Sequence, residues 1–451
     1  MRRLLSVLCA ALCLFACTFS AQSELALLNA QPPTATPTPL HTPTPPSVRY
    51  APPLDPSVYA LRAQVQSDRL MHTLSHLVSF GTRHVLSAAD HPERGISAAR
   101  NWLVRAFERV RAAHPHKPIQ IWTQPFAFTW QGRQVHAENV VAVLQGSMAG
   151  AGAYVIGAHY DSIGSPPNDE NAYAPGANDN GSGVAALLEI MRIMADQPHR
   201  ATLIFVAFAA EETGRQGSIA FVENYLKAHL PHGVMRGMIN LDMLGNTRDA
   251  NGRVDSRTVR LFSAPPNDSP SRQLARQIAF AISTYTDEVS PVLQSSEDRM
   301  GRWGDQMSFS AAGYPAVRLI QSLEDHTRQH NGRDTLDAID LDYLMRTTRA
   351  ALTAVAVLGG GLPPPLPESI ALSRLPDGYR LTWASIPTAS GYLIALRRTA
   401  SLGYDLVVSV DAPQLAWDQF TRYETLAIAA VDAAGRFGSF SPEVRVRDLL
   451  R

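Results

Sequence analysis

The central part of the chain, from about Leu54 to Leu358, alternates two hydrophobic patterns. Within residues 96–114, apolar side chains recur every three or four positions with Arg and Glu between them, which predicts an amphipathic surface helix. Short apolar runs without polar alternation predict strands that are covered on both faces. These runs occupy residues 139–144, 153–158, 202–208, 238–241 and 315–320.

Helical patterns separate the predicted strands. They cover residues 183–194, 217–226, 271–284 and 341–358. Alternating strands and helices are typical of a parallel sheet with helices on both faces. The sequence therefore predicts an α/β domain over residues 54–361, built as three layers around a mostly parallel sheet.

The pattern changes after a Pro-rich linker at 362–367. Residues 368–451 read as short strands with turn signals, which predicts a small all-β sandwich and resembles a fibronectin type III domain. Trp383 and Tyr392 lie on predicted strands with apolar alternation, so we expect them in the core of the sandwich. Two roles stay open for this domain, a passive spacer or a weak contact to carbohydrate or protein at a cell surface.

Residues 1–21 read as an export signal, because two arginines precede an apolar run too short to anchor a chain permanently in a bilayer. Cys17 follows a segment that resembles a bacterial lipoprotein processing box. The alternatives are a lipid anchor at Cys17 or cleavage a few residues later, and both predict a mature chain that is extracellular or in the cell envelope. Residues 22–53 are rich in Pro and Thr, which favours an extended linker. We expect no transmembrane helix further along the chain.

The composition limits the classes of partner and the kinds of metal ligand that we expect. Forty basic and forty acidic residues give a formal net charge of zero, so nothing favours a nucleic acid or an anionic membrane as partner. All three cysteines, at positions 9, 13 and 17, lie in the predicted export signal. A metal site in the folded part must therefore use His, Asp and Glu.

Acids and histidines follow the predicted strands. His159 and Asp161 come after the strand at 153–158, and residues two apart in an extended segment point the same way. A metal-bound imidazole needs an acceptor for its other ring nitrogen, which Asp161 would supply. An isolated histidine near a strand end is more often a structural residue, so this pair alone is weak evidence.

Three further acidic segments strengthen the pattern. Asp179 lies in a Gly- and Asn-rich segment that leads into a helix, where a turn with a helix cap is the plainer interpretation. Glu211 and Glu212 directly follow the strand at 202–208, and two buried acids are costly unless a cation neutralises them. Asp242 ends the strand at 238–241. Ligands bind at such strand ends in open α/β sheets.

A second histidine completes the set after the last strand. The segment 325–335 contains His326 and His330, together with Asp334. Two histidines with several carboxylates and no thiol suit zinc, with manganese or cobalt as substitutes.

Taken together, these segments resemble the dizinc exopeptidase family, which includes secreted bacterial aminopeptidases, glutamate carboxypeptidase and glutaminyl cyclase. The resemblance covers roughly residues 58–358. It rests on five stretches in order, namely Tyr154 to Ser162, Gly176 to Gly183, Glu211 to Gly214, Asn240 to Asp242 and Asp334 to Asp337.

The resemblance implies two zinc ions per chain and peptide substrates. His159 and Asp242 would bind one zinc ion, Glu212 and His330 the other, and Asp179 would bridge them. Glu211 would be the general base towards a zinc-activated water, and Asp161 would orient His159. The activity it implies is that of an aminopeptidase. A carboxypeptidase or a glutaminyl cyclase, which typically uses one zinc, stays an alternative, and a non-catalytic cell-surface binding protein is a third.

The sequence departs from the family pattern in places. His330 has Asp334 at the family spacing but is followed by Asn331 where Thr is usual, and we favour it over His326 as the ligand. Gln329 stands where some members have a Tyr that steadies the oxyanion, and Gln306 replaces a frequent His. Metal binding should survive these changes, whereas the oxyanion donor and the substrate preference are left open.

Overall fold

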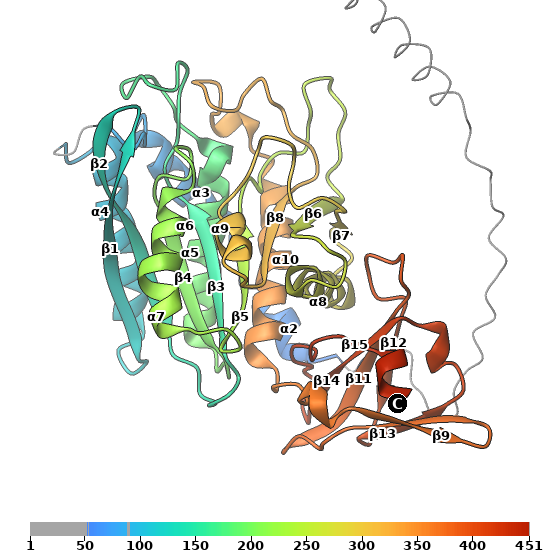
Figure 1. The fold of residues 1–451 in the computed structure, drawn as a ribbon. Helices are drawn as coiled ribbons and strands as arrows, with labels where there is room; N and C mark the ends of the chain where they lie inside the picture. The colour runs from blue at the N-terminus through green and yellow to red at the C-terminus, as the bar shows by residue number, and fades with distance from the viewer. Residues whose placement is uncertain (1–51, 53, 88–90, 451) are drawn as a thin grey trace, which may run out of the picture. The chain divides into compact units, whose positions relative to one another are not determined.

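The computed structural model describes residues 52, 54–87 and 91–450, which belong to one unit of the fold (Figure 1). The predicted export signal, Cys17 and nearly all of the predicted linker at 22–53 lie outside the described residues. Among the described helices, none is both long and apolar enough to cross a membrane.

An eight-stranded sheet forms the larger part of the fold. Its four central strands run parallel to one another, and antiparallel pairs join them to both margins. The strands follow the order β1 (Ile119–Trp130), β2 (Arg133–Leu144), β4 (Thr202–Phe208), β3 (Ala153–His159), β5 (Met235–Leu241), β8 (Ala316–Gln321), β6 (Thr258–Ser263) and β7 (Ser290–Leu293). The mostly parallel sheet expected from the sequence is confirmed.

Helices cover both faces of this sheet, as Figure 1 shows. Alternate residues of each strand point to opposite faces, so that Val140 packs with one layer of helices and Val141 with the other. The helices are α2 (Pro56–Arg62), α3 (Ser67–Ser79), α4 (Gly95–Ala113), α5 (Gly183–Asp196), α6 (Gln216–Phe221), α7 (Lys227–His229), α8 (Pro270–Tyr285), α9 (Gln306–Ala311) and α10 (Leu341–Gly360). The three-layer prediction is therefore correct.

The margins of the sheet differ from the sequence-based expectation. Strands β1 and β2 form a long antiparallel hairpin, whereas the sequence pattern predicted only the second half of β2. Positive φ angles at Gln131 (46°) and Gly132 (77°) suit the tight turn between them. The outer strand was missed because most of its residues are only partly buried, so its pattern is not the continuous apolar run of a central strand.

A β-sandwich follows the sheet domain. Strands β13 (Gln414–Trp417), β10 (Gly378–Thr382) and β9 (Ala371–Leu375) form one sheet, and strands β12 (Leu406–Val410), β11 (Ala389–Arg397), β14 (Thr425–Asp432) and β15 (Val444–Arg445) form the other. Trp383 and Tyr392 lie in the core that the two sheets share, with ring centres 5.2 Å apart. Their predicted core position is confirmed, while the fibronectin type III identity stays a prediction.

Buried ion pairs join the sandwich to the sheet domain. Glu443 lies between Arg276 of α8, at 2.7 Å, and Arg397 of β11, at 3.0 Å, and all three side chains are almost fully buried. Arg436 pairs with Asp55 at 2.6 Å. Asp55 also caps the first turn of α2. The sandwich is thus packed against the sheet domain through buried ion pairs, and its two predicted roles stay predictions.

Glu443→Gln should destabilise the chain by about 3–5 kcal/mol, because two buried guanidinium groups lose their shared counter-charge. Thermal and urea unfolding would measure the loss. Glu223→Gln is the control, since Glu223 pairs with Lys227 on an exposed helix surface at 2.6 Å. Equal stability of the two variants would contradict a structural role for the buried cluster.

Candidate metal centre

The sequence-predicted site residues gather at one edge of the sheet, where the parallel strands end. His159 ends β3, Glu211 and Glu212 follow β4, and Asp242 follows β5. Asp179 comes from the segment before α5, and His330 from the loop between β8 and α10. Because the strands are parallel, their carboxyl ends bring residues from distant parts of the chain together.

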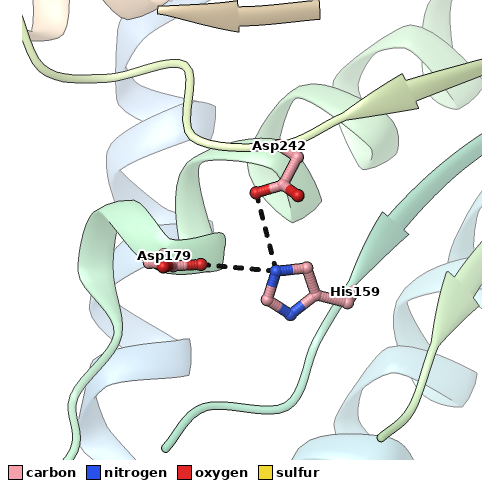
Figure 2. A group of neighbouring side chains, drawn as sticks. All are labelled: His159, Asp179 and Asp242. Atoms are coloured by element: carbon pink, nitrogen blue, oxygen red, sulfur yellow. Dashed lines mark ion pairs between the residues drawn. The ribbon is translucent and has the colours of Figure 1, made fainter. Parts of the chain in front are cut away.

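His159 is the centre of a first group. Its Nε2 atom lies 3.3 Å from Oδ1 of Asp179 and 3.6 Å from Oδ1 of Asp242. Figure 2 shows the imidazole ring directed at both carboxylates. The three ligand atoms lie within 4.8 Å of one another, a spacing that can hold a metal ion.

Asp179 also belongs to a second group. Its other oxygen, Oδ2, lies 3.4 Å from Nε2 of His330, and that nitrogen lies 3.2 Å from Oε2 of Glu212. These three residues also satisfy the spacing for a metal ion. A single carboxylate therefore stands between two three-residue groups, one oxygen towards each.

Asp161 orders the residues around the first group. One of its oxygens lies 3.5 Å from Nδ1 of His159, a distance that suits an ion pair better than a short hydrogen bond. Its two oxygens accept hydrogen bonds from the backbone N–H groups of Glu211 and Glu212, both at 3.1 Å. One carboxylate thus positions the histidine and both glutamates.

Asp334 holds the segment that carries Asp179. Its carboxylate accepts hydrogen bonds from the backbone N–H groups of Asn178, at 2.9 Å, and Asp179, at 2.8 Å. Gly183 allows the same segment to approach β5, because a Cβ atom there would lie 2.2 Å from the carbonyl oxygen of Leu241. This contact brings Asp179 close to Asp242.

Two buried arginines support the site and were not predicted. Arg83 donates hydrogen bonds to backbone carbonyl oxygens around the Asp179 segment, including that of Gly176 at 2.9 Å. Arg318 pairs with Asp242 at 2.9 Å. Arg318 interrupts an otherwise apolar strand pattern, which is a signal that sequence reasoning could have used, whereas nothing around Arg83 marks it.

The pKa values of the acids show that burial makes ionising these carboxylates unfavourable unless positive charge lies nearby. Burial raises the pKa of Glu211 well above its usual range, and it raises that of Glu212 to about 8. Burial opposes ionisation of Asp242 as well, but Arg318 and His159 hold its pKa below the usual value. Several carboxylates are therefore buried together at a cost that nearby positive charge must offset.

The histidines respond to the same charges. The carboxylate of Glu212 raises the pKa of His330 to about 9. Although burial lowers the pKa of His159, the carboxylates of Glu211 and Asp242 raise it well above its usual value. Both imidazoles lie where positive charge is strongly favoured.

Unsatisfied atoms in the cluster fit a bound cation. Among the described residues, Oε1 of Glu212 and Oδ1 of Asp242 are buried and have no hydrogen-bond partner. Buried polar atoms are normally paired, and coordination to a metal ion pairs an oxygen as well as a hydrogen bond does. Carboxylate and imidazole ligands without thiolates suit zinc and similar divalent metals.

The alternative histidine lies elsewhere. His326 contacts Arg302, at 2.9 Å, and Gln329, at 3.2 Å, and it belongs to neither three-residue group. The geometry thus brings His330, and not His326, to Asp179.

Gln306, which stands where a His is frequent in the family, accepts a hydrogen bond from Asn240 at 3.1 Å and donates one to Asp298 at 2.6 Å.

The two groups line one cleft of about 290 Å³. Glu211 is also on its wall, with Oε2 at 4.0 Å from Nε2 of His159. Its carboxylate thus lies beside the first group without belonging to it. A buried carboxylate beside two groups that could each hold a metal ion is an arrangement suited to metal-assisted hydrolysis.

Sequence comparison agrees with this geometry. Residues 139–355 match the model of peptidase family M28. A protein described as a probable zinc metalloprotease from Pyrenophora tritici-repentis is 31% identical over 427 residues, which cover 86% of this chain and 97% of that protein. The chain belongs to peptidase family M28. A probable zinc metalloprotease from Pyricularia oryzae is 32% identical over 78% of this chain and 75% of its own length.

Solved structures show that the M28 fold recurs in different enzymes. The Legionella pneumophila aminopeptidase LapA aligns with a TM-score of 0.55 at 23% identity, over 70% of this chain and 78% of that one. The Macrostomum lignano glutaminyl cyclase aligns with a TM-score of 0.53 at 17% identity, over 67% of this chain and 93% of that one. At these identities the likeness concerns the fold, which does not choose between the two activities.

Asp334→Asn should weaken divalent-cation binding about ten- to a hundredfold, because an amide cannot accept both backbone N–H groups that position Asp179. Titration of the metal-free chain with Co²⁺, followed by absorbance, would measure the change. Asp337→Asn serves as the control, since Asp337 lies on the same loop but is exposed and pairs with Arg328 at 2.9 Å. Equal Co²⁺ affinity of the two variants would show that Asp334 does not organise the site.

Proposed function

We propose that this member of peptidase family M28 is an exported dizinc exopeptidase, and that it acts as an aminopeptidase on peptides. The observation that carries the proposal is the position of Asp179, with one oxygen towards each of two complete ligand groups. The family, the zinc metalloproteases among its relatives and the aminopeptidase with a similar fold support it.

The ligand assignment follows the two groups. His159 and Asp242 would hold one zinc ion, Glu212 and His330 the other, and Asp179 would bridge them. When bound, two zinc ions would polarise the scissile carbonyl and lower the pKa of the attacking water.

Glu211 is the residue proposed to move the proton. It lines the cleft beside the first ligand group and has no place in either group. Its carboxylate would accept a proton from the attacking water and return it to the leaving amine. Asp161 contacts both His159 and the backbone N–H group of Glu211, and these contacts would keep the proposed base and the proposed ligands at a fixed separation.

Glu211→Gln should lower the turnover of aminoacyl anilides by about a hundred- to ten-thousandfold, since the amide cannot take up the proton. Zinc content should stay at the wild-type level because Glu211 is not a proposed ligand. Steady-state kinetics and elemental analysis of the same sample measure both quantities. Glu170→Gln, which changes an acid outside the cleft, is the control, and unchanged turnover in Glu211→Gln would refute the assignment.

The same superfamily contains two alternatives, a carboxypeptidase and a glutaminyl cyclase. The similar fold of the Macrostomum lignano glutaminyl cyclase supports the cyclase alternative. A cyclase typically needs a single zinc ion, however, and this site offers two ligand groups. A non-catalytic binding protein is disfavoured because every member of the ligand set is present.

Mass analysis of peptides incubated with the metal-loaded chain separates these activities. We expect peptides to shorten from the amino end, one residue at a time. Shortening from the carboxyl end would establish a carboxypeptidase instead. Loss of ammonia from an amino-terminal Gln, with no residue removed, would establish a cyclase.

Export is part of the proposal. It rests on the pattern of residues 1–21, where two arginines precede a short apolar run. The mature chain would be secreted or, if Cys17 is lipidated, anchored in the cell envelope. A contact between the sandwich and a cell surface is a further element of this proposal.

A further inference from the structure

Arginines line the wall of the metal cleft. Four of them face the same space as the proposed zinc ligands, and they come from three separate segments. Arg215 follows the Glu211–Glu212 pair, Arg299 and Arg302 lie on the loop between β7 and α9, and Arg318 lies on β8.

Two of these arginines already have anionic partners. Arg318 pairs with Asp242 at 2.9 Å and with Asp298 at 3.1 Å. Arg299 also pairs with Asp298, at 3.3 Å, and with a buried glutamate on the loop after β8. Their charges are therefore compensated within the fold.

The other two arginines differ. Arg302 donates hydrogen bonds to Nδ1 of His326, at 2.9 Å, and to the side-chain oxygen of Gln329, neither of which carries a negative charge there. The guanidinium carbon of Arg215 lies 5.5 Å from the ring centre of Trp303. Among the described residues, neither guanidinium forms an ion pair. Each guanidinium group carries five N–H donors, so donors remain on Arg302 beyond the two that these hydrogen bonds use.

The charge balance of the cleft makes this pair significant. Four carboxylates line the cleft, from Asp179, Glu211, Glu212 and Asp242. Two divalent cations would carry the charge that balances these four. Arg215 and Arg302 would then be the arginines of the cleft wall that have no anionic partner among the described residues, and an unpaired guanidinium group in a confined cleft attracts anionic ligands.

We propose that the cleft selects substrates that carry a carboxylate beside the scissile bond, and that Arg215 and Arg302 bind this carboxylate. The proposal rests on the peptidase function proposed above and names its substrate class. Guanidinium groups recognise carboxylates with paired, charge-assisted hydrogen bonds. Arg302 is held in place by its two neutral acceptors and Arg215 by the indole of Trp303, so both are positioned before a substrate arrives.

A peptide can present this carboxylate in two ways. It can be the side chain of an Asp or Glu that contributes the scissile carbonyl. It can also be the terminal α-carboxylate of a short peptide, on the far side of the scissile bond. Both sources share the chemistry that the arginines recognise, and matched substrates distinguish them.

The test compares kcat/KM for paired substrates in the wild-type enzyme, Arg215→Gln and Arg302→Gln. One pair is glutamyl and glutaminyl anilide, and the other is a Leu-Gly dipeptide with a free or an amidated carboxyl end. We expect the wild type to prefer the charged member of one pair, which identifies the source of the carboxylate. Each variant should lower that preference about ten- to a hundredfold.

Arg253→Gln is the control, because Arg253 is exposed and pairs with Asp249 at 3.3 Å outside the cleft. It removes the same charge and should leave the preference unchanged. The proposal is overturned if the wild type shows no preference in either pair. It is also overturned if the cleft variants lose activity on both members of a pair equally, since that result indicates a structural role.

Calorimetric titration separates this proposal from the peptidase function. Glutamate against glutamine and glycine against glycinamide reproduce the two pairs without catalysis, and the charged member of one pair should bind more tightly to the wild type only. If that preference holds but no peptide is cleaved, the peptidase function fails and carboxylate recognition stands. If leucyl anilide is cleaved but no preference exists in binding or turnover, carboxylate recognition fails and the peptidase function stands.

Discussion

The structure depends on a group of carboxylates that the fold buries at one edge of a parallel sheet. Asp161, Asp179, Glu211 and Asp242 are almost fully removed from water. Such a group is unfavourable by itself, because each charge loses its hydration and repels its neighbours. Imidazoles, two buried arginines and the proposed cations supply the compensating charge, and the positions of the surrounding loops follow from that requirement.

Hydrogen bonds from the backbone to two neighbouring carboxylates hold these acids in place. Asp161 and Asp334 each accept hydrogen bonds from two consecutive backbone N–H groups and thereby fix the segments that carry Glu211, Glu212 and Asp179. The proposed ligands therefore lie on segments that other carboxylates hold in place. Ligand geometry set in advance costs less to adopt when a metal ion or a substrate binds.

Sequence patterns predicted most of the sheet, and they predicted which side chains meet at its edge, for a physical reason. A central parallel strand is apolar on both faces, so a run such as residues 202–208 identifies both the strand and its functional end. The hairpin strand β1 lacks that signal because it is half exposed. Arg83 could not be predicted either, because its role depends on carbonyl groups brought to it by the fold rather than on neighbouring residues. The ion pair between Arg276 and Glu443 likewise joins segments 167 residues apart.

The central claim is that Asp179 joins two metal positions. The most direct measurement is the zinc content of the purified, dialysed chain by elemental mass spectrometry, together with that of Asp179→Ala. The account predicts two zinc ions per wild-type chain and a loss of both tightly held ions in the variant, because each ligand group loses its shared member. One zinc ion per wild-type chain, or full retention of zinc by the variant, would contradict it.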